Sequence, residues 1–320
     1  MIRNKRWIKE QLKYCRAFIH EEWASRADGI AFHNFWSFAH RQELWLYQFM
    51  QRPSIQTKLS RKRVVFFSVF GPRHLVKYGR GDLRIFFTGE NLARFPTYAD
   101  HLKDQVDLCL GFDESIQADN YLRFPLWLTY LIAPFANLLQ IQQSLKAVEQ
   151  ATRTMPIPQG FASLVARHDN NGIRGELGDI LSSIGPIAYG GHFRNNQSKA
   201  IGPEVKDKLH FISKYQFHIC PENSNRSGYV TEKIFHAHQA GVIPVYWGSD
   251  NAPEPMVLQP TSILFYYSSK EEELLQQVKT LYTSESAYRA FRQQDLFVAG
   301  AAEYIYERIQ ALEQAIVDHL

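Results

Sequence analysis

The residues best placed for chemistry follow a short apolar run, YQFHICPE, in the segment from 215 to 250. A polar loop containing Gly228 comes next, then a helical pattern that closes at Gly241, then a second apolar run, VIPVYWG. This order predicts one strand–helix–strand crossover. Ligands of doubly wound sheets bind beyond the carboxyl ends of strands, where helix N-termini offer free N–H groups and partial positive charge to phosphates. The loop from 222 to 231 is therefore a candidate phosphate-binding site.

Four side chains near the start of this helix have helical spacing. Tyr229, Glu232, Lys233 and His236 follow the i, i+3, i+4, i+7 pattern, and they share one face if the helix begins between 229 and 231. That face could touch a ribose, a diphosphate and a sugar. Spacing alone favours the alternative, an ordinary charged helix start. The pattern therefore indicates a site without identifying its ligand.

A second candidate lies in PIAYGGHFRNN, residues 186–196. Gly190 and Gly191 follow a predicted strand and allow close approach of the backbone, and Arg194 could offer its planar guanidinium to phosphate oxygens. The sequence has neither a GxGxxG motif nor a Walker lysine motif. A plain surface loop with an exposed arginine is the alternative.

A third candidate is Glu90 in FFTGEN, a carboxylate at the end of a hydrophobic predicted strand. A carboxylate in that position suits a general base at a cleft between two domains, and the neighbouring Asn91 could orient a ligand. The alternative is a glutamate that is simply solvated at a strand end.

Metal and disulfide sites are not predicted. His236 and His238 point about 200° apart on a helix and cannot share a metal on one face, so we expect the histidines to be structural or surface residues. No DxD motif is present, and a metal-free diphosphate site neutralised by Arg and Lys fits better. Cys15, Cys109 and Cys220 are far apart and odd in number, which favours a reducing, cytoplasmic compartment.

Length and composition set the framework for these candidates. The chain has 320 residues, 45% hydrophobic and 21% charged, which predicts a compact globule and favours two domains over one very large one. Its formal net charge of +4 could favour phosphate-bearing ligands but gives no nucleic-acid-binding footprint.

Alternating strand and helix patterns predict an α/β fold. We expect strands near 29–33, 63–71, 84–91 and 106–114, and helices within 33–50 and 136–152. The prolines of TMPIPQG (154–160) indicate a linker, which predicts domains 1–153 and 154–320, where the last helices could pack back on the N-terminal domain. Beyond it, the strands and helices that we expect form βαβ units of a parallel, doubly wound sheet. The strands are 161–166, 186–191, 215–222, 241–248 and 262–267, the helices are 176–184, 204–213 and 231–239, and the last fifty residues are helical.

Two apolar segments raise the question of membranes. Residues 124–139 carry no charge but are interrupted by two prolines and are short for a bilayer span of about 20 residues, so we expect a buried segment. The N-terminus carries too many basic residues for a signal peptide. Its apolar stripe could touch anionic lipid at the inner membrane, and the favoured alternative is a helix packed on the domain. The stripe is Ile8, Leu12, Cys15 and Ile19, beside Arg3, Lys5, Arg6, Lys9, Lys13 and Arg16.

Several motifs, taken in order and spacing, resemble the α-1,3/4-fucosyltransferases of glycosyltransferase family 10, and bacterial members most of all. They are FFTGEN, GFD, YLRFP, GGHFRNN and PENSNRSGYVTEKIFHAHQAGVIPVYWGS. The resemblance is strongest in GYVTEK and IPVYWGS and extends over about four fifths of the chain. Animal members carry a membrane anchor and disulfides, and some bacterial members carry C-terminal heptad repeats and a basic tail, none of which is expected here.

The resemblance implies a GT-B architecture, in which two Rossmann-like domains face a cleft, with GDP-fucose in the C-terminal domain and the acceptor in the N-terminal one. It implies an inverting transfer in which Glu90 is the base and Arg194 and Lys233 hold the diphosphate. Three further residues match donor-site positions: Asn223, Tyr229, which would shape the pocket, and Glu232, which would contact ribose or fucose. No metal is obligatory, although Mn²⁺ or Mg²⁺ could stimulate.

The acceptor implied is an oligosaccharide or lipid-linked glycan, such as the GlcNAc of a galactosyl-GlcNAc unit in a bacterial surface polysaccharide, joined through an α-1,3 or α-1,4 linkage. Residues 1–80 match the family poorly, so neither linkage nor acceptor is fixed by the motifs. Two alternatives stay open: a transferase for another GDP-linked deoxysugar, and a non-catalytic glycan- or nucleotide-binding module.

Overall fold

The computed structural model describes residues 2–36, 40–202 and 204–320, with only the backbone for residues 2–6. The side chains of Arg3, Lys5 and Arg6 therefore lie outside the described residues. The chain forms two compact units, Met1–Ala136 with Tyr306–Leu320, and Asn137–Ile305. Each contains a five-stranded parallel sheet, which confirms the predicted α/β class.

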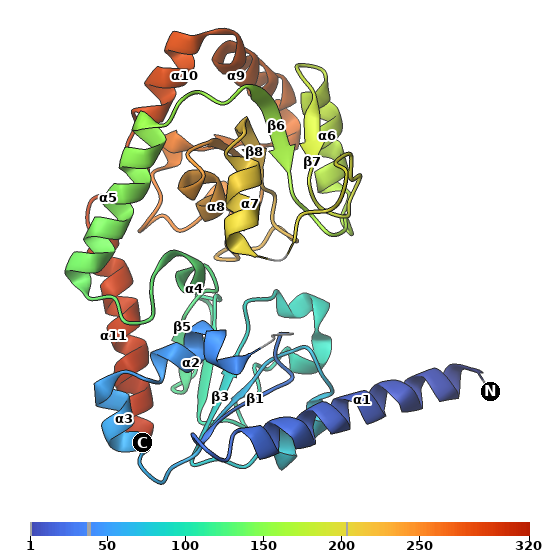
Figure 1. Cartoon of the computed structure of the whole chain (residues 1–320), viewed down its shortest axis with the longest axis vertical. Coiled ribbons are helices and arrows are strands. Elements are labelled where there is room, and N and C mark those ends of the chain that lie inside the picture. Colours follow the sequence, from blue (N-terminus) through green and yellow to red (C-terminus); the bar gives the residue numbers. More distant parts are fainter. Residues whose placement is uncertain (1, 37–39, 203) are drawn as a thin grey trace. The chain divides into compact units, whose positions relative to one another are not determined.

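The sheet of the N-terminal unit has the strand order β1-β2-β3-β4-β5, so sequence order and spatial order coincide (Figure 1). Ile30 of β1 pairs with Val64 of β2, which in turn pairs with Leu83 of β3. β1, β2 and β4 are completely buried, as expected for continuous apolar runs in a parallel sheet. The strands are β1 (Ile30–His33), β2 (Val64–Phe67), β3 (Leu83–Phe87), β4 (Leu108–Gly111) and β5 (Tyr121–Arg123).

The helices of this unit are short apart from the first. They are α1 (Ile2–Ala24), α2 (Trp45–Phe49), α3 (Pro53–Leu59) and α4 (Leu128–Leu131). Only two parts of the helix predicted within 33–50 are helical, namely α2 and a 3₁₀ turn at Arg41–Glu43, and for the other described residues the prediction is wrong. Residues 37–39 lie outside the described part of the chain. The aromatic side chains after β1 pack individually instead of forming a helical stripe, with the Trp36 ring 5.0 Å from that of Phe70.

The second unit has the strand order β10-β9-β8-β6-β7, which confirms the predicted doubly wound parallel sheet. Helices flank this sheet, and its core joins the inward faces of β6, β8 and β9 to α6 and α9. The strands are β6 (Gly160–Leu164), β7 (Ile187–Tyr189), β8 (Tyr215–Ile219), β9 (Ile243–Tyr246) and β10 (Leu264–Phe265). The helices are α5 (Leu138–Thr154), α6 (Ile173–Ser182), α7 (Val205–Ile212), α8 (Lys233–Gln239), α9 (Glu271–Thr283) and α10 (Glu285–Arg292). The last helix, α11 (Ala301–His319), begins in this unit and belongs to the N-terminal unit from Tyr306 on.

The border between the units lies at residues 136 and 137, whereas the linker pattern places it at 153 and 154. Residues 154–160 are a connection inside the second unit, from α5 to β6. α5 belongs to that unit because the Thr152 hydroxyl donates to the carbonyl of His238, 3.2 Å away, and the Glu149 carboxylate accepts from the amide of Leu296. The prolines therefore mark a turn within a domain rather than a border.

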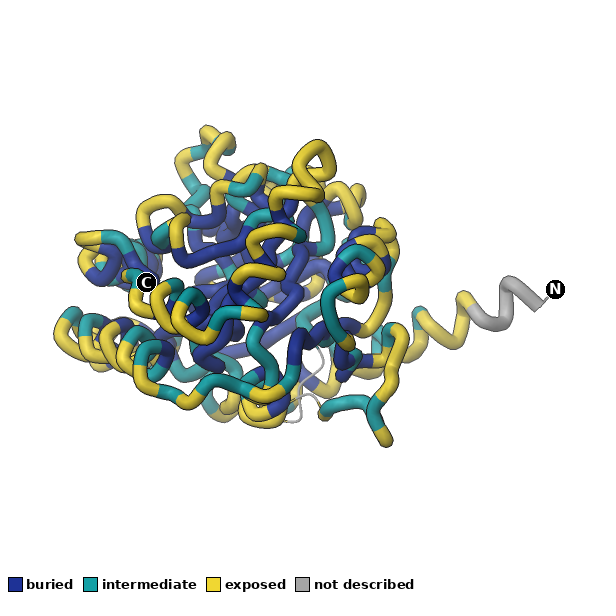
Figure 2. The backbone as a smooth tube through the Cα atoms, turned by 90° about the horizontal axis from the view of Figure 1, so that it is seen from above, coloured by how far each residue is buried: buried dark blue, intermediate teal, exposed yellow. Residues whose placement is uncertain are grey.

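The predicted apolar stripe of α1 faces solvent, so it is not the face by which the helix packs. Ile8, Leu12 and Ile19 are 48%, 52% and 67% exposed. Figure 2 shows the described N-terminal turns of α1 mainly in yellow, the colour of exposed residues. The packing face is another one: the Phe18 ring stacks on that of His33 at 4.0 Å, and Glu21 accepts from the amide of Phe32. The favoured expectation of a helix packed on the domain is therefore confirmed for the C-terminal part of α1, but the apolar stripe is not the face that packs.

The uncharged segment 124–139 is part of the core in its first half, as predicted. Phe124, Trp127 and Leu128 are fully buried. Within the described residues, no helix combines the length and the apolar character that crossing a bilayer requires.

Candidate functional site

The strand–helix–strand crossover predicted over 215–250 is present as β8, a loop, α8 and the parallel strand β9. α8 begins at Lys233, later than the sequence pattern predicts, and Tyr229 therefore lies in the loop instead of on the helix. The shared helical face predicted for Tyr229, Glu232, Lys233 and His236 is wrong in its geometry. The loop itself brings three of these four side chains into one polar network.

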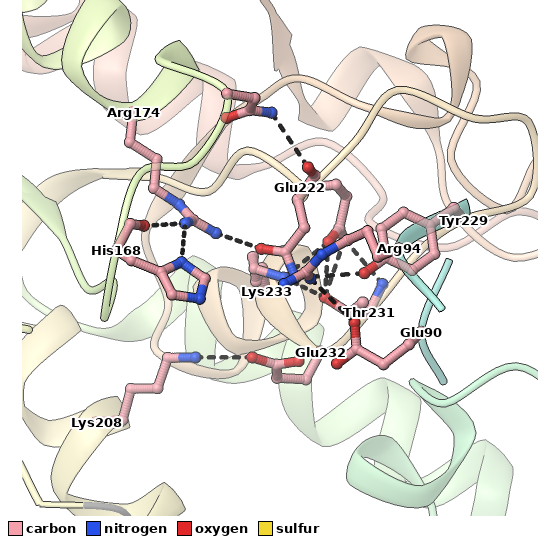
Figure 3. A network of polar contacts seen from close by, with 12 residues as sticks. Glu90, Arg94, His168, Arg174, Lys208, Glu222, Tyr229, Thr231, Glu232 and Lys233 are labelled. Atoms are coloured by element: carbon pink, nitrogen blue, oxygen red, sulfur yellow. Dashed lines mark hydrogen bonds and ion pairs between the residues drawn. The ribbon is translucent and has the colours of Figure 1, made fainter. Parts of the chain in front are cut away.

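The centre of this network is Glu222, at the carboxyl end of β8, which has no exposed surface. One carboxylate oxygen accepts from the amide of Thr231 at 2.8 Å. The other accepts from the Thr231 hydroxyl and from the Lys233 ammonium group, both at 2.8 Å (Figure 3). Lys233 also donates to the Thr231 hydroxyl oxygen, at 2.6 Å. Glu222 thus holds both ends of the loop and fixes the ammonium group at the first turn of α8.

Gly248 is required for this arrangement because it leaves room for Glu222. A Cβ atom at Gly248 would lie 2.8 Å from the Cβ of Glu222. The φ angle of Gly248 is 141°, which residues other than glycine rarely adopt. The glycine of the IPVYWGS motif therefore serves packing against the loop.

Lys233 keeps its positive charge in this site. Burial lowers the pKa of Lys233, but attraction to Glu222 and Glu232 outweighs burial, and the net effect raises the pKa above its usual range. The side chain retains 16% of its exposure, so a ligand can still reach it. A fixed ammonium group beside a loop at the end of a parallel strand can neutralise a diphosphate.

Glu232 is the second carboxylate of the network and pairs with Lys208 of α7 at 3.1 Å. Burial raises the pKa of Glu232, but the ammonium groups of Lys208 and Lys233 hold it well below the usual range. Glu232 is therefore an ionised acceptor, suited to the hydroxyl groups of a ribose or a sugar.

Asn223 and Tyr229 are joined across the loop. The Arg174 guanidinium, from α6, donates to the side-chain oxygen of Asn223 at 2.5 Å and also to the carbonyl of His168. The amide nitrogen of Asn223 lies 3.4 Å from the Tyr229 hydroxyl, and the Tyr229 side chain is buried. Asn223 and Tyr229 thus meet across the loop, and Figure 3 shows Tyr229, Glu232 and Lys233 in the same group of polar contacts.

Arg194 lies at the edge of this network rather than inside it. It pairs with Asp179 of α6, with one nitrogen–oxygen distance of 3.0 Å, and its guanidinium passes close to Gly175, the neighbour of Arg174. Gly191 serves packing: a Cβ there would overlap the carbonyl oxygen of Ala166. Arg194 itself is 42% exposed and is free to exchange its surface partner for a ligand.

Glu90 belongs to the other unit, just beyond β3. The Glu90 amide donates to the Thr88 hydroxyl at 3.0 Å, and the carboxylate pairs with Arg94 at 3.3 Å. The carboxylate side chain retains 18% exposure, so it is held in place and accessible. Asn91 caps the following 3₁₀ turn by accepting from the amide of Ala93, which gives it a structural task.

Four members of the donor-side network are not among the predicted site residues: Arg174, Lys208, Glu222 and Thr231. Arg174 and Lys208 look like ordinary surface charges in amphipathic helices, and only the fold brings them to the loop. The sequence does contain a signal for Glu222. Its carboxylate follows an apolar strand, where an unpaired charge is unusual, and a threonine and a lysine at the start of the next helix could pair with it.

We expect the histidines to be structural or surface residues, and those near α8 are structural and buried. His236 and His238 are buried, and burial lowers their pKa values to about 3 and about 4. Burial also holds the pKa of His218 well below its usual range. The structure shows no group of three or more possible metal ligands in the described part of the chain, and the three cysteines are free.

These buried histidines predict acid-sensitive stability. The pKa of His238 is about 4 in the fold and about 6.5 unfolded, so the unfolded chain binds the proton first, and stability is lost as the pH falls below about 6.5. Between pH 7.5 and pH 5, His238 alone accounts for about 2 kcal/mol of unfolding free energy. Urea unfolding at both pH values measures this loss. We expect it to shrink in His238→Leu and to stay unchanged in the exposed control His210→Leu.

Comparison with known proteins assigns the family and the class of fold. The model of the alpha-(1,3)-fucosyltransferase FucT N-terminal domain matches residues 30–130, and that of the C-terminal part of glycosyltransferase family 10 (fucosyltransferase) matches residues 161–298. The chain belongs to glycosyltransferase family 10. The predicted resemblance is confirmed by both matches.

Individual relatives agree with this. The chain is 31% identical over 249 residues to the alpha-(1,3)-fucosyltransferase FucT of Helicobacter pylori, over 70% of this chain and 49% of that protein. It thus spans about half the length of that curated relative. A crystal structure of an alpha1,3-fucosyltransferase covers 90% of this chain and 89% of its own, with 25% identity and a TM-score of 0.60. The structure of an alpha1,3-fucosyltransferase with GDP-fucose covers 80% of this chain and 78% of its own, with 26% identity and a TM-score of 0.53. The fold is of the GT-B class.

Proposed function

We propose that this protein is an inverting fucosyltransferase that transfers L-fucose from GDP-β-L-fucose to a hydroxyl group of an acceptor glycan. The observation that carries the proposal is the buried Glu222–Thr231–Lys233 arrangement, which fixes an ammonium group beside the loop at the end of β8. It lies in the part of the chain that matches the fucosyltransferase family model.

The donor side supplies charge and orientation. Lys233, together with Arg194, neutralises the diphosphate as it leaves, and this removes the need for an obligatory metal; Mn²⁺ or Mg²⁺ would at most stimulate. Glu232 accepts hydrogen bonds from hydroxyl groups of the ribose or the fucose, and the side-chain amide of Asn223 donates a hydrogen bond to the same sugars. Tyr229, a loop residue whose side chain is buried, shapes the pocket.

The acceptor side supplies the base. Glu90 takes the proton of the acceptor hydroxyl as its oxygen attacks the anomeric carbon of fucose. The bond from that carbon to the GDP oxygen breaks in the same displacement, and GDP departs with the electron pair. Attack from the opposite face converts the β-linked donor into an α-linked product.

For the acceptor, we propose the GlcNAc of a galactosyl-GlcNAc unit in an oligosaccharide or lipid-linked glycan of a bacterial surface polysaccharide. The linkage proposed is α-1,3, in line with the relatives described above, and α-1,4 is the alternative. The alternative is a transferase for another GDP-linked deoxysugar. Such an enzyme would bind GDP through the same residues and would differ only in the residues that contact the sugar.

Isothermal titration with GDP-fucose, GDP, GDP-mannose and UDP-galactose tests the donor, first without metal and then with Mn²⁺. We expect saturable binding of GDP compounds, tightest for GDP-fucose, and no binding of UDP-galactose. Tighter binding of another GDP sugar would point to the other deoxysugar. A folded sample that binds none of them would overturn the proposal and leave a non-catalytic module.

We also propose that α1 attaches the protein peripherally to the cytoplasmic face of an anionic membrane. Its solvent-facing stripe, Ile8, Leu12 and Ile19, has Lys9 and Arg16 beside it on the helix. We expect co-sedimentation with phosphatidylglycerol vesicles that the triple change to serine at the three apolar positions abolishes. Met256→Ser, at an exposed apolar residue of the other unit, serves as the control. Equal sedimentation of all three proteins would argue against attachment through α1.

A further inference from the structure

A basic cavity of about 800 Å³ in the N-terminal unit takes no part in the proposed transfer reaction. It lies between the turn from α1 to β1 (residues 25–29) and the turn from α3 to β2 (residues 59–63). These turns lead directly into β1 and β2, so the cavity lies at the amino edge of the parallel sheet. Glu90 follows β3 at the opposite, carboxyl edge. The volume is that of a small-molecule site.

Basic side chains dominate the wall of this cavity. They are Arg26, Arg61, Lys62 and Arg63. Asp28 is the one carboxylate among the described residues that line the cavity. It pairs with Arg41 at 2.7 Å and accepts from the Tyr47 hydroxyl at 3.0 Å, so its charge is already engaged outside this basic group.

Three of the four cations have no counter-charge. In the described part of the chain, the side chains of Arg26, Arg61 and Lys62 form neither an ion pair nor a hydrogen bond. Arg63 pairs with Glu22 at 2.9 Å, but its Nε atom is buried and finds no acceptor among the described residues. Like charges around one cavity repel one another, and an anion bound among them would relieve that repulsion.

The ends of α1 and α3 do not use this positive charge. Basic side chains often follow a helix because they bind its last carbonyl groups. Here the carbonyl groups of residues 21–24, the last four of α1, accept from backbone amides, from the Ser25 hydroxyl and from the Arg41 guanidinium. The Leu59 carbonyl at the end of α3 accepts from the amide of Lys62 at 2.7 Å. The basic side chains of the wall therefore stay available to a ligand.

The composition of the wall favours a phosphate group over other anions. A carboxylate brings one charge and would neutralise one cation. A phosphate monoester or a diphosphate carries about two charges near neutral pH and has at least three acceptor oxygens. Guanidinium groups bind such oxygens through two parallel hydrogen bonds, and an ammonium group adds a point charge. Two unpaired arginines and one unpaired lysine match that chemistry.

We propose that this cavity binds a phosphate group, held by Arg26, Arg61 and Lys62. The site is separate from the donor site and does not depend on the proposed transferase activity. Two sources can supply the phosphate: a soluble phosphorylated compound, or the headgroup of an anionic lipid. The second source fits the neighbourhood, because Ile19 and Trp23 of α1, which shortly precede Arg26, are 67% and 70% exposed.

Isothermal titration with pyrophosphate tests the soluble source, with GDP at saturating concentration to fill the donor site. The cavity variant is Arg26→Gln/Arg61→Gln/Lys62→Gln, which leaves Arg63 to pair with Glu22. We expect its Kd to rise about tenfold or more over that of the wild-type protein, since several charge-assisted hydrogen bonds are lost. The matched control removes the same charge from exposed residues of the same unit, outside the cavity wall, and should keep the wild-type Kd. It is Lys77→Gln/Arg80→Gln/Lys103→Gln.

Co-sedimentation with phosphatidylglycerol vesicles tests the lipid source, with phosphatidylcholine vesicles as the uncharged reference. Pyrophosphate binding that only the cavity variant loses supports the site with a soluble ligand. Sedimentation that only the cavity variant loses, without pyrophosphate binding, supports it with a lipid headgroup. Thermal melts establish that both variants fold, and Arg26→Gln alone should show a smaller loss in the same direction.

Two results would overturn the inference. One is a wild-type protein that binds neither pyrophosphate nor phosphatidylglycerol vesicles. The other is equal behaviour of the cavity variant and the control variant in both assays. Absence of GDP binding would instead contradict the proposed function and would leave the comparison of the two variants intact.

Discussion

Lys233→Ala is expected to lower kcat/KM for fucosyl transfer by about 10²–10³-fold, the usual loss when one preorganised charge donor is removed from a transition state. The reason is geometric: Glu222 and the Thr231 hydroxyl hold the Lys233 ammonium group at 2.8 and 2.6 Å, so no motion is needed as charge develops on the diphosphate. The affinity for GDP should fall in the same variant. Titration with GDP and initial-rate measurements check both effects.

Loss of the Lys233 charge also leaves Glu222 buried without its cation, which costs about 3–5 kcal/mol of stability. The double variant Glu222→Gln/Lys233→Met removes both charges together, so it should fold well and still fail to transfer fucose. Lys206→Ala, at a lysine side chain that is 78% exposed on α7, should behave like wild type. A folded double variant with normal transfer would remove Lys233 from the mechanism.

Glu90→Gln is expected to lower kcat by about 10²–10⁴-fold, the range for removal of a general base, while GDP-fucose binding stays unchanged. The substitution keeps the size of the side chain and removes only the ability to accept the proton. Stopped-assay kinetics and donor titration measure these effects.

The matched control for Glu90 is Glu114→Gln in the same unit, at a carboxylate that is 66% exposed and pairs with Arg123. It should keep wild-type kcat. Wild-type kcat in Glu90→Gln would show that another group takes the proton. A parallel loss of donor affinity in that variant would instead show that Glu90 serves donor binding.

Much of the fold is predictable because each sheet is built from continuous apolar runs. β2, β3, β8 and β9 lie where VVFF, RIFF, YQFHI and IPVY predict them, since a strand buried on both faces must be apolar throughout. β5 is not predictable in this way. Its residues, Tyr121–Arg123, are half-buried at the sheet edge and make a short, mixed run.

The helix expected over 33–50 shows where local pattern fails. Its aromatic residues have the density of a buried helix, but their contacts are with strands far along the chain, such as Trp36 with Phe70 and Phe87. Non-local packing of this kind overrides helical periodicity. For the same reason the border of the compact units differs from the one that the linker pattern predicts, because the contacts of α5 with residues near 238 and 296 have no signal in the sequence around it.

Within the candidate site, the sequence predicts the residues proposed to bind the donor, but it does not predict the neighbouring residues that hold them in place. Asn223, Glu232 and Lys233 stand out through motif and spacing. The groups that hold them, Arg174, Lys208 and Glu222, come from α6, α7 and the end of β8, and only the folded chain brings them together. A network that joins several elements has no signature in any one of them.

The end of α11 constrains the order in which the chain can fold during synthesis. Residues 306–320 belong to the N-terminal unit, where the Glu313 carboxylate pairs with the buried Arg52 at 2.5 Å. The ribosome makes them after every residue of the second unit. The unit whose synthesis begins first can therefore be completed only after the second unit has been made, and the second unit, continuous from 137 to 305, can reach its native state before it.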